Sequence, residues 1–388
     1  MTTGAATPRP GRRRRAAPPR LRVVGADAER SRHASWLELF FDLVFVVAIA
    51  ELAAVLHDDP NVGGVLAFAA LNVTLIWTWM NFTFYADQFE SDDAVFRVAM
   101  FLAMAAVLVM AVALDPPGAV FVAAYVAIKL LLVWLYLRPL AGDLDATARA
   151  FCRWCAVAYG SSAVLWALSL LLPEPYRYGL WAVGLAVEIL FPAVGPSAFE
   201  QMPLHLEHIP ERFGLFTIIV FGETLVITAL GLESDDLSVA AGVTAGLGFA
   251  LACALWWLYF DRQEETALRP TIRPNLVFIY GHIPLLVGLN AATVGVEFAI
   301  EHASSHPLHL DERLIAMGGL AVALLALTAI QGATRAGLTR VAIRARCGVA
   351  AALVVAGLLS LAAVPLLALA LALLLGLVLV GGRREAVA

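Results

Sequence analysis

The sequence predicts an all-α polytopic membrane protein with about twelve transmembrane helices, and three observations support this fold class. Of the 388 residues, 61% are hydrophobic and only 15% are charged, whereas a soluble domain carries about 25% charged residues. The apolar residues fall into repeated runs of roughly 20 residues, which is long enough for a helix to cross the hydrocarbon core. The third observation is that arginine is concentrated in alternate gaps between these runs.

Twelve apolar segments are expected to span the membrane. They cover approximately 37–56, 64–85, 96–114, 118–137, 151–172, 178–195, 213–231, 239–260, 275–300, 314–334, 347–363 and 366–380. Only Val364 and Pro365 separate the last two, which are short. These two segments therefore form either a tight hairpin or one broken element.

The arginine distribution tests this count independently, because cytoplasmic loops of membrane proteins carry an excess of Lys and Arg. With a cytoplasmic N-terminus, 23 Arg fall in inside segments and only Arg177 and Arg313 fall in outside loops. Dropping one internal helix would move the later Arg clusters outside, so any error in the count is an even number. Both termini are predicted to be cytoplasmic, in a multi-pass protein of the bacterial cytoplasmic membrane.

The two ends of the chain are expected to lie outside the packed helices. Residues 1–35 are rich in Pro, Ala and Arg, and they predict a disordered basic cytoplasmic tail because such a composition forms no core. Residues 383–388 form a short cytoplasmic C-terminal tail. A signal peptide fits poorly, because the first apolar stretch contains Asp42 and Glu51 and has no small-residue cleavage site.

An internal repeat is expected to divide the membrane part into a first half, 36–200, and a second half, 201–382. The matched pairs are Leu39-Phe40 with Leu215-Phe216, Val44-Phe45 with Val220-Phe221, and Tyr85-x-Asp87-x-x-Glu90 with Tyr259-x-Asp261-x-x-Glu264. Six segments separate the matched elements, so the halves form two parallel six-helix repeats. Transporters often use such repeats, with a substrate site between the halves. Chance similarity between apolar helices is the alternative.

Three stretches place charged residues at fixed positions in apolar helices: Glu38 to Ile49, Glu211 to Glu223, and His282 to Glu297. They resemble the signatures of the bacterial low temperature requirement protein A (LtrA) family, and the resemblance covers about 35–380. That family is named for a requirement for growth in the cold and has no settled biochemical activity. The resemblance implies a membrane topology and a link to low-temperature growth, but it supplies no catalytic residues.

Ionisable and amide side chains inside the apolar segments are the candidates for a substrate or ion pathway, because such groups are costly in lipid and usually face the protein interior. Glu223 is the leading candidate, since it lies near the middle of the seventh segment between Gly222 and Thr224. A protonated glutamate that is hydrogen-bonded in the core is the alternative. The full set of pathway candidates is Glu223, Asp42, Glu188, His282, Glu297, Glu51 and Asn290.

Helical spacing relates several of these residues to one another. Asp42 and Glu38 are four residues apart and share a helical face, where Asp42 is expected to cap a helix or pair with an Arg. Glu51 lies nine residues beyond Asp42 and points elsewhere. Glu188 and Lys129 both lie mid-segment, and they form a structural ion pair if they touch.

The ninth segment carries two different faces. His282, Asn290 and Glu297 lie within about 80° of one another around the helix axis, which predicts a polar face toward a cavity. Gly281, Gly288 and Gly295 recur every seven residues and predict a seam of close helix packing. For His282, a buried histidine satisfied by hydrogen bonds is the alternative.

The structural or gating candidates are Asp87, Asp261, Lys129, Glu38 and Arg212. Asp87 and Asp261 are matched by the repeat at the ends of the second and eighth segments. Their recurrence predicts a shared structural task, such as fixing an inner loop, and a gate is the functional alternative.

Other patterns carry little weight. Cys152 and Cys155 have redox spacing but lie at a membrane helix end, and we expect no structural disulfide. His302, His306 and His309 lie in an outer loop of irregular sequence. Neither a phosphate-binding glycine loop nor a zinc-protease His-Glu-x-x-His pair is present, so no cofactor and no resident metal are expected.

The best functional hypothesis is a secondary transporter or ion-translocating protein rather than an enzyme. The repeat, the carboxylates within the segments and the lack of a nucleotide-binding domain favour it. Its partners would be the lipid bilayer and a small ion or solute, with no nucleic acid. The alternatives are a membrane-embedded lipid-modifying enzyme and a non-transporting sensor or scaffold. The substrate and the oligomeric state do not follow from the sequence.

Overall fold

The computed structural model describes residues 19–21, 34–90, 93–195, 197, 202, 208–230, 238–262, 268–269, 272, 275–304, 307–334 and 337–385. Within these residues the chain forms twelve α-helices, which confirms the predicted fold class. They are α1 (Trp36–Asp58), α2 (Val62–Gln88), α3 (Ala94–Val112), α4 (Ala119–Leu137), α5 (Ala146–Ser169), α6 (Tyr176–Val194), α8 (His208–Leu230), α9 (Val239–Phe260), α10 (Leu276–Glu301), α11 (Leu310–Gly332), α12 (Arg340–Leu358) and α13 (Ala363–Glu385). A short 3-10 helix, η1 (Arg138–Ala141), extends α4.

Ten helices of the described part are long and apolar enough to cross a membrane. The two others are α5, which carries Arg149 and Arg153 near its start, and α13, whose apolar part is shorter and covers Ala363–Leu379. The helices α12 and α13 are separate and pack against each other, so the last two predicted segments form a hairpin.

Polar residues in the gaps explain where many helices begin. At the start of α1, the Ser35 hydroxyl accepts a hydrogen bond from the Glu38 amide, while the Glu38 carboxylate accepts one from the Ser35 amide. This reciprocal arrangement satisfies two amides that a helix leaves unbonded at its start. Single side-chain caps start α2, α3, α5, α9 and α12, from Asn61, Asp93, Asp145, Ser238 and Thr339 respectively.

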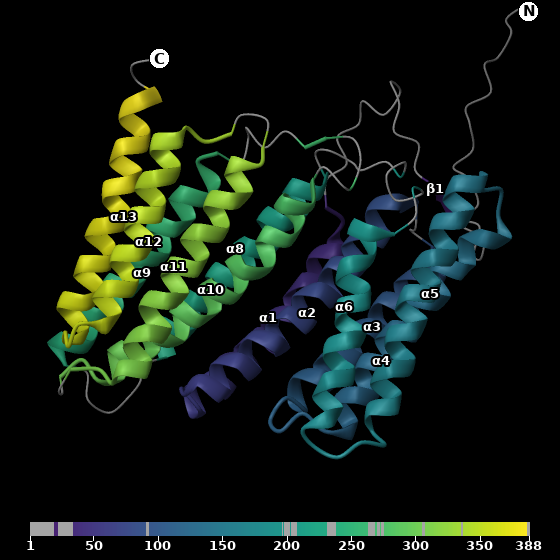
Figure 1. The fold of residues 1–388 in the computed structure, drawn as a ribbon, viewed down its shortest axis with the longest axis horizontal. Coiled ribbons are helices and arrows are strands. Elements are labelled where there is room, and N and C mark those ends of the chain that lie inside the picture. The colour runs from purple at the N-terminus through teal and green to yellow at the C-terminus, as the bar shows by residue number, and fades with distance from the viewer. Residues whose placement is uncertain are drawn as a thin grey trace, which may run out of the picture.

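The helices gather into two groups that match the predicted halves (Figure 1). In the first, α1 packs on α2 and α3, and each helix from α3 to α6 packs on the next. In the second, α8 packs on α9 and α10, and each helix from α10 to α13 packs on the next. The same order of neighbours recurs, which supports the repeat, although the boundary between the halves stays a prediction.

The predicted glycine seam lies between α10 and α11. A Cβ atom added at Gly288 would lie 2.6 Å from the backbone nitrogen of Ala323, and one at Gly295 would overlap Ala316. Glycine therefore allows the two backbones to approach closely, as expected for helix packing in membranes.

The prediction that residues 1–35 are disordered is wrong for two residues. Arg20 and Leu21 form strand β1 (Arg20–Leu21), which pairs antiparallel with β2 (Phe89–Glu90) directly after α2. Leu21 packs against the hydrophobic core, and this contact anchors the segment. The other residues of the predicted tail, apart from 19, 34 and 35, lie outside the described part, as do residues 386–388 of the C-terminal tail.

Candidate functional site: buried polar contacts between the two halves

Arg212 and Asp42 form a buried ion pair that joins the two halves. Arg212 on α8 donates from Nη1 and Nη2 to the two carboxylate oxygens of Asp42 on α1, at 2.9 and 2.7 Å. The indole Nε1 of Trp79 on α2 also donates to Asp42, at 2.7 Å. A buried charge needs such partners, because desolvation is otherwise very costly. The expected pairing of Asp42 with an arginine is therefore found, across the boundary between the halves.

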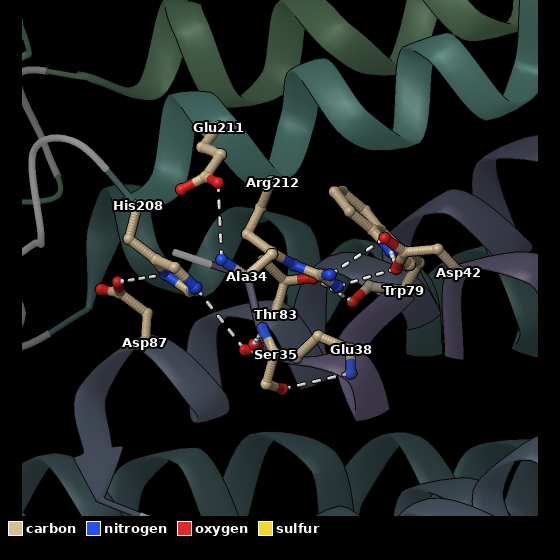
Figure 2. Close-up of polar contacts among 10 residues, drawn as sticks. All are labelled: Ala34, Ser35, Glu38, Asp42, Trp79, Thr83, Asp87, His208, Glu211 and Arg212. Carbon is tan, nitrogen blue, oxygen red and sulfur yellow. Dashed lines mark hydrogen bonds and ion pairs between the residues drawn. The ribbon is translucent and has the colours of Figure 1, made fainter. Parts of the chain in front are cut away.

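His208 extends this contact toward the start of α1 (Figure 2). Its Nδ1 lies 3.0 Å from Asp87 Oδ1 on α2, and its Nε2 lies 3.5 Å from Glu38 Oε1 on α1. The Nδ1 contact has hydrogen-bond geometry, whereas the Nε2 contact is only within ion-pair distance. We call Glu38, Asp42, Asp87, His208 and Arg212 the inter-half ionic cluster.

The cluster is sorted by charge. Its three carboxylates all come from α1 and α2 in the first half, and its two basic groups both come from α8 in the second half. All five residues are at most 2% exposed. The cluster lies at the end of the bundle where α1 begins and α13 ends, which we call the terminal end (Figure 1). The halves thus meet there through buried acidic groups of one and buried basic groups of the other.

Two further polar contacts between the halves lie deeper in the bundle. Asn290 on α10 donates from Nδ2 to Asn72 Oδ1 on α2, at 2.8 Å. His57 near the end of α1 contacts both carboxylate oxygens of Glu301 on α10, at 3.1 and 3.2 Å. At about 1.5 Å per residue, Asp42, Asn290 and His57 lie roughly 9, 21 and 32 Å along their helices from the terminal end. A polar seam therefore runs through the interface.

The far end of this seam also contains Glu297. One ligand atom each from His57, Glu297 and Glu301 lie within 4.8 Å of one another, a spacing that suits a metal ion. However, His57 already bonds to Glu301 and stacks on Phe298, with ring centroids 4.7 Å apart. Two of the three groups, His57 and Glu301, therefore already bond to each other.

Glu188 and Lys129 form a second buried ion pair, which lies within the first half. Lys129 Nζ donates to Glu188 Oε2 at 2.6 Å, and both side chains are fully buried. Trp77, Asn81 and Tyr125 also donate to Glu188, at 3.0, 3.2 and 3.1 Å. Glu188 and Lys129 were predicted to form a structural ion pair if they touch, and they do touch. The carboxylate of Glu188 is thus already paired with a cation within the first half.

Glu223 does not join these groups. Its side chain is only partly buried, and its neighbour Gly222 has open space where a Cβ atom would lie. The other neighbour, Thr224, bonds to Thr293 at 2.7 Å within the second half. The hydrophobic sequence around Glu223 marks a span but does not tell which face points outward. Glu223 thus lies apart from the contacts between the halves, and its role in a pathway stays a prediction.

The predicted polar face of the ninth segment is also divided. His282 Nδ1 bonds to the Phe278 carbonyl at 2.7 Å, and its Nε2 lies 2.9 Å from the Tyr259 hydroxyl. Asn290 and Glu297 instead belong to the middle and far end of the seam. His282 therefore matches the alternative of a satisfied, buried histidine, and the three residues do not line one cavity together.

The remaining candidates lie apart from the cluster. Glu51 is exposed and, as predicted, points away from Asp42. Asp261 is exposed after the last residue of α9, whereas its counterpart Asp87 is buried against His208. The two residues therefore have different surroundings, because α2 faces the other half while α9 packs on α13, and a shared task for them stays a prediction.

The structure gives no further support to the cysteine and histidine patterns as functional sites. All four cysteines are free, with Cys152 and Cys155 buried. The His302 ring bonds to the Phe298 carbonyl at 3.0 Å. His306 lies outside the described residues.

Sequence reasoning missed three of the residues that matter here. His208 lies four residues before Arg212 and thus shares its helical face, but it precedes the apolar run at which the segment was expected to begin. Asn72 and Trp79 carry no charge, so the cost of a charge in lipid did not single them out as site candidates. A search for amides and indoles within apolar runs would have found both.

Comparison with known proteins agrees with this architecture. The model of the family described as "Bacterial low temperature requirement A protein (LtrA)" matches residues 33–381. An uncharacterized protein of Rhizobium meliloti (strain 1021) is 30% identical over 292 residues, which cover 69% of this chain and 70% of that protein.

Proposed function

The chain belongs to the bacterial low temperature requirement A protein (LtrA) family, and from this premise we propose that it is a secondary transporter or ion-translocating protein of the cytoplasmic membrane. The observation that carries the proposal is the charge sorting of the inter-half ionic cluster. Carboxylates of one half meet basic groups of the other, inside a helical bundle, at the interface where transporters with repeated halves move.

Two halves that only pack against each other can do so without these charges. Apolar side chains hold helices together without the desolvation cost of buried ions, and replacing a buried ion pair by apolar residues is often neutral or stabilising. Ionisable groups within membrane segments instead commonly mark ion pathways and proton relays. The sorting favours a contact that forms and breaks, with Glu38, Asp42 and Asp87 released to bind a proton or cation when α8 withdraws.

The rest of the seam fits such a movement. Asn72 with Asn290 and His57 with Glu301 are contacts between side chains at the middle and far end of the interface. Each is a polar contact that a movement of one half against the other would break. With the terminal end placed in the cytoplasm by the arginine distribution, the described conformation would be closed to the cytoplasm at the ionic cluster.

The test is ion flux into liposomes that contain the purified protein and a pH-sensitive dye. Proton, sodium and potassium gradients are imposed on the wild type, on Asp87→Asn and on the control Glu223→Gln. Asp87→Asn keeps an oxygen for His208 but removes the charge, while the control removes a carboxylate outside the cluster. We expect flux in the wild type and the control, and a loss of at least about tenfold in Asp87→Asn.

Two outcomes would contradict the proposal. Wild-type protein that is folded and monodisperse but passes no ion under any gradient would argue against ion translocation, and would favour the sensor or enzyme alternatives. Equal flux in Asp87→Asn and wild type would remove the ionic cluster from the pathway.

A further inference from the structure

An apolar groove lies between the two halves at the end of the bundle opposite the terminal end. The end of α1 and the start of α2 line it from the first half, and α10 and α11 line it from the second half. Along α11 its wall runs from Asp311 to Val322, which is roughly 16 Å at 1.5 Å per residue. One leaflet of the hydrocarbon core is about 15 Å deep, which is half of the full thickness. The groove therefore runs along the depth of one leaflet.

The groove is open because the side chains around it do not fill it. It contains about 440 Å³ of space, which falls in the range of roughly 300–1,000 Å³ that is typical of ligand sites. A Cβ atom added at Gly318, in the wall on α11, would meet nothing within 4 Å. On the side of α2, Val62 and Leu66 are 73% and 65% exposed. The two halves thus leave a recess that a further molecule can enter.

The wall of the groove fits a hydrocarbon chain better than water or an ion. Of the described lining residues, only Asp311 has a polar side chain, and the others are Ala, Gly, Val, Leu, Ile, Phe and Pro. Ordered water needs polar partners, and an ion along this wall would lose its hydration without compensation. In a bilayer the surrounding apolar material is lipid, whose flexible chains gain many close contacts along such a wall. An acyl chain is therefore the occupant that the groove favours.

The mouth of the groove carries acidic side chains. Asp311 lines the groove there and is exposed. Asp58 and Asp59 are also exposed, where α1 ends and just before Pro60 of the wall. The nearby Arg313 does not offset these charges at the groove, because it is buried and donates to backbone carbonyls. A positively charged group at the mouth is therefore attracted, whereas a headgroup with a net negative charge is repelled.

We propose that the groove binds one acyl chain of a phospholipid whose headgroup carries an amine, of the phosphatidylethanolamine type. The chain lies along α11 beside Gly318, and the ammonium group lies at Asp311. With the terminal end in the cytoplasm, as proposed above, the lipid belongs to the outer leaflet. It contacts both halves beside the polar seam, since Ala291 of the wall directly follows Asn290. The binding of this lipid does not depend on the transport function proposed above.

Lipid retention by the full-length purified protein tests this proposal. The protein is reconstituted in vesicles of equimolar phosphatidylethanolamine and phosphatidylglycerol with identical chains, extracted in a mild detergent, and weighed as an intact complex by mass spectrometry. We expect the wild type to retain at least about twofold more phosphatidylethanolamine than phosphatidylglycerol, as for an exposed charge contact. Asp311→Asn removes the acidic group that lines the mouth and should bring this ratio closer to one. Equal retention of the two lipids by the wild type would overturn the proposal.

Two matched substitutions test where the chain lies. Gly318→Leu fills the groove from α11, so it should lower the retained phosphatidylethanolamine at least about threefold. Gly246→Leu adds the same side chain on α9, where an added Cβ atom also meets nothing within 4 Å, and it should retain lipid as the wild type does. Both variants should keep the wild-type melting temperature in detergent, since neither Cβ atom meets protein atoms.

The outcomes separate this proposal from the function proposed above. Undiminished retention in Gly318→Leu would show that the groove holds no lipid chain and would overturn the lipid proposal. Retention that persists in protein without any ion flux would overturn the transport proposal alone.

Discussion

The buried charges of this protein are arranged in two ways at the scale of single residues. Lys129 and Glu188 neutralise each other within the first half and receive three further hydrogen bonds. Asp42 and Arg212 do so across the halves, with Trp79 as the additional donor. Breaking either pair leaves an uncompensated ion in a dry environment, which typically costs about 3–5 kcal/mol.

A double-mutant cycle on Asp42 and Arg212 tests whether this pair joins the halves as the distances indicate. Asp42→Asn and Arg212→Met should each lower the free energy of unfolding by about 3–5 kcal/mol, because each leaves the other charge unpaired. The double variant should be more stable than the sum of the two single losses predicts, since no unpaired ion remains. Unfolding in mixed detergent gives the four free energies. Additive losses would mean that the two side chains do not interact in the folded protein.

The sequence predicted part of this pattern at the residue scale. Spacing of four residues placed Glu38 and Asp42 on one face, and both are buried in the same cluster. It could not tell which arginine meets Asp42, because the partner lies 170 residues away. It also could not separate Glu223 from the interior residues, since an apolar helix gives no sign of which face is covered by neighbours.

At the scale of the elements, the spacing of small residues was informative because glycine acts locally. The period of seven in α10 predicted a packing seam, and α11 fills it with Ala316 and Ala323. Polar residues in the gaps are a second local signal, since Asn61, Asp93 and Asp145 cap the helices that follow them. Both signals depend on residues near in sequence, which is why they could be found without a structure.

The glycine seam between α10 and α11 predicts that substitution by alanine changes the free energy of unfolding differently at two glycines. Gly288→Ala would place a Cβ atom 2.6 Å from the Ala323 backbone nitrogen and 2.7 Å from the Gly319 carbonyl oxygen, so α10 and α11 must move apart. We expect a loss of about 1–3 kcal/mol, as for overpacked interiors. Gly246→Ala on α9 meets nothing within 4 Å and should be neutral, or stabilise through helix propensity by up to about 1 kcal/mol. Thermal unfolding in detergent measures the stability of both variants. Equal changes in stability would contradict the glycine seam.

At the scale of the whole molecule, the two halves repeat the order of helix contacts but differ in what surrounds each helix. Trp77 and Trp79 in the last part of α2 are buried, whereas Trp256 and Trp257 in the last part of α9 are about half exposed. The reason is that α2 packs against α8 and α10 of the other half, while α9 packs against α13. A repeat in sequence therefore predicts the path of the chain, but it does not predict which copy of a residue faces the interface.

If the halves move against each other, a covalent bridge across the polar seam between them should stop transport, whereas a bridge within one half should not. Asn72→Cys with Asn290→Cys places two thiols at the middle contact between α2 and α10. Thr224→Cys with Thr293→Cys places two thiols between α8 and α10 of the second half, where the hydroxyls lie 2.7 Å apart. Both pairs are made in a background in which the native Cys152, Cys155, Cys253 and Cys347 are replaced.

A short, reducible bifunctional thiol reagent then bridges each pair in proteoliposomes, and mass spectrometry gives the bridged fraction. Flux through the first pair should fall in proportion to that fraction and return on reduction, because the bridge prevents the halves from separating at the seam. The second pair should keep its flux, since α8 and α10 move together as parts of one half. Full flux through a completely bridged first pair would mean that the solute or ion crosses without separation of the halves, so the contacts of the seam would be fixed supports rather than a gate.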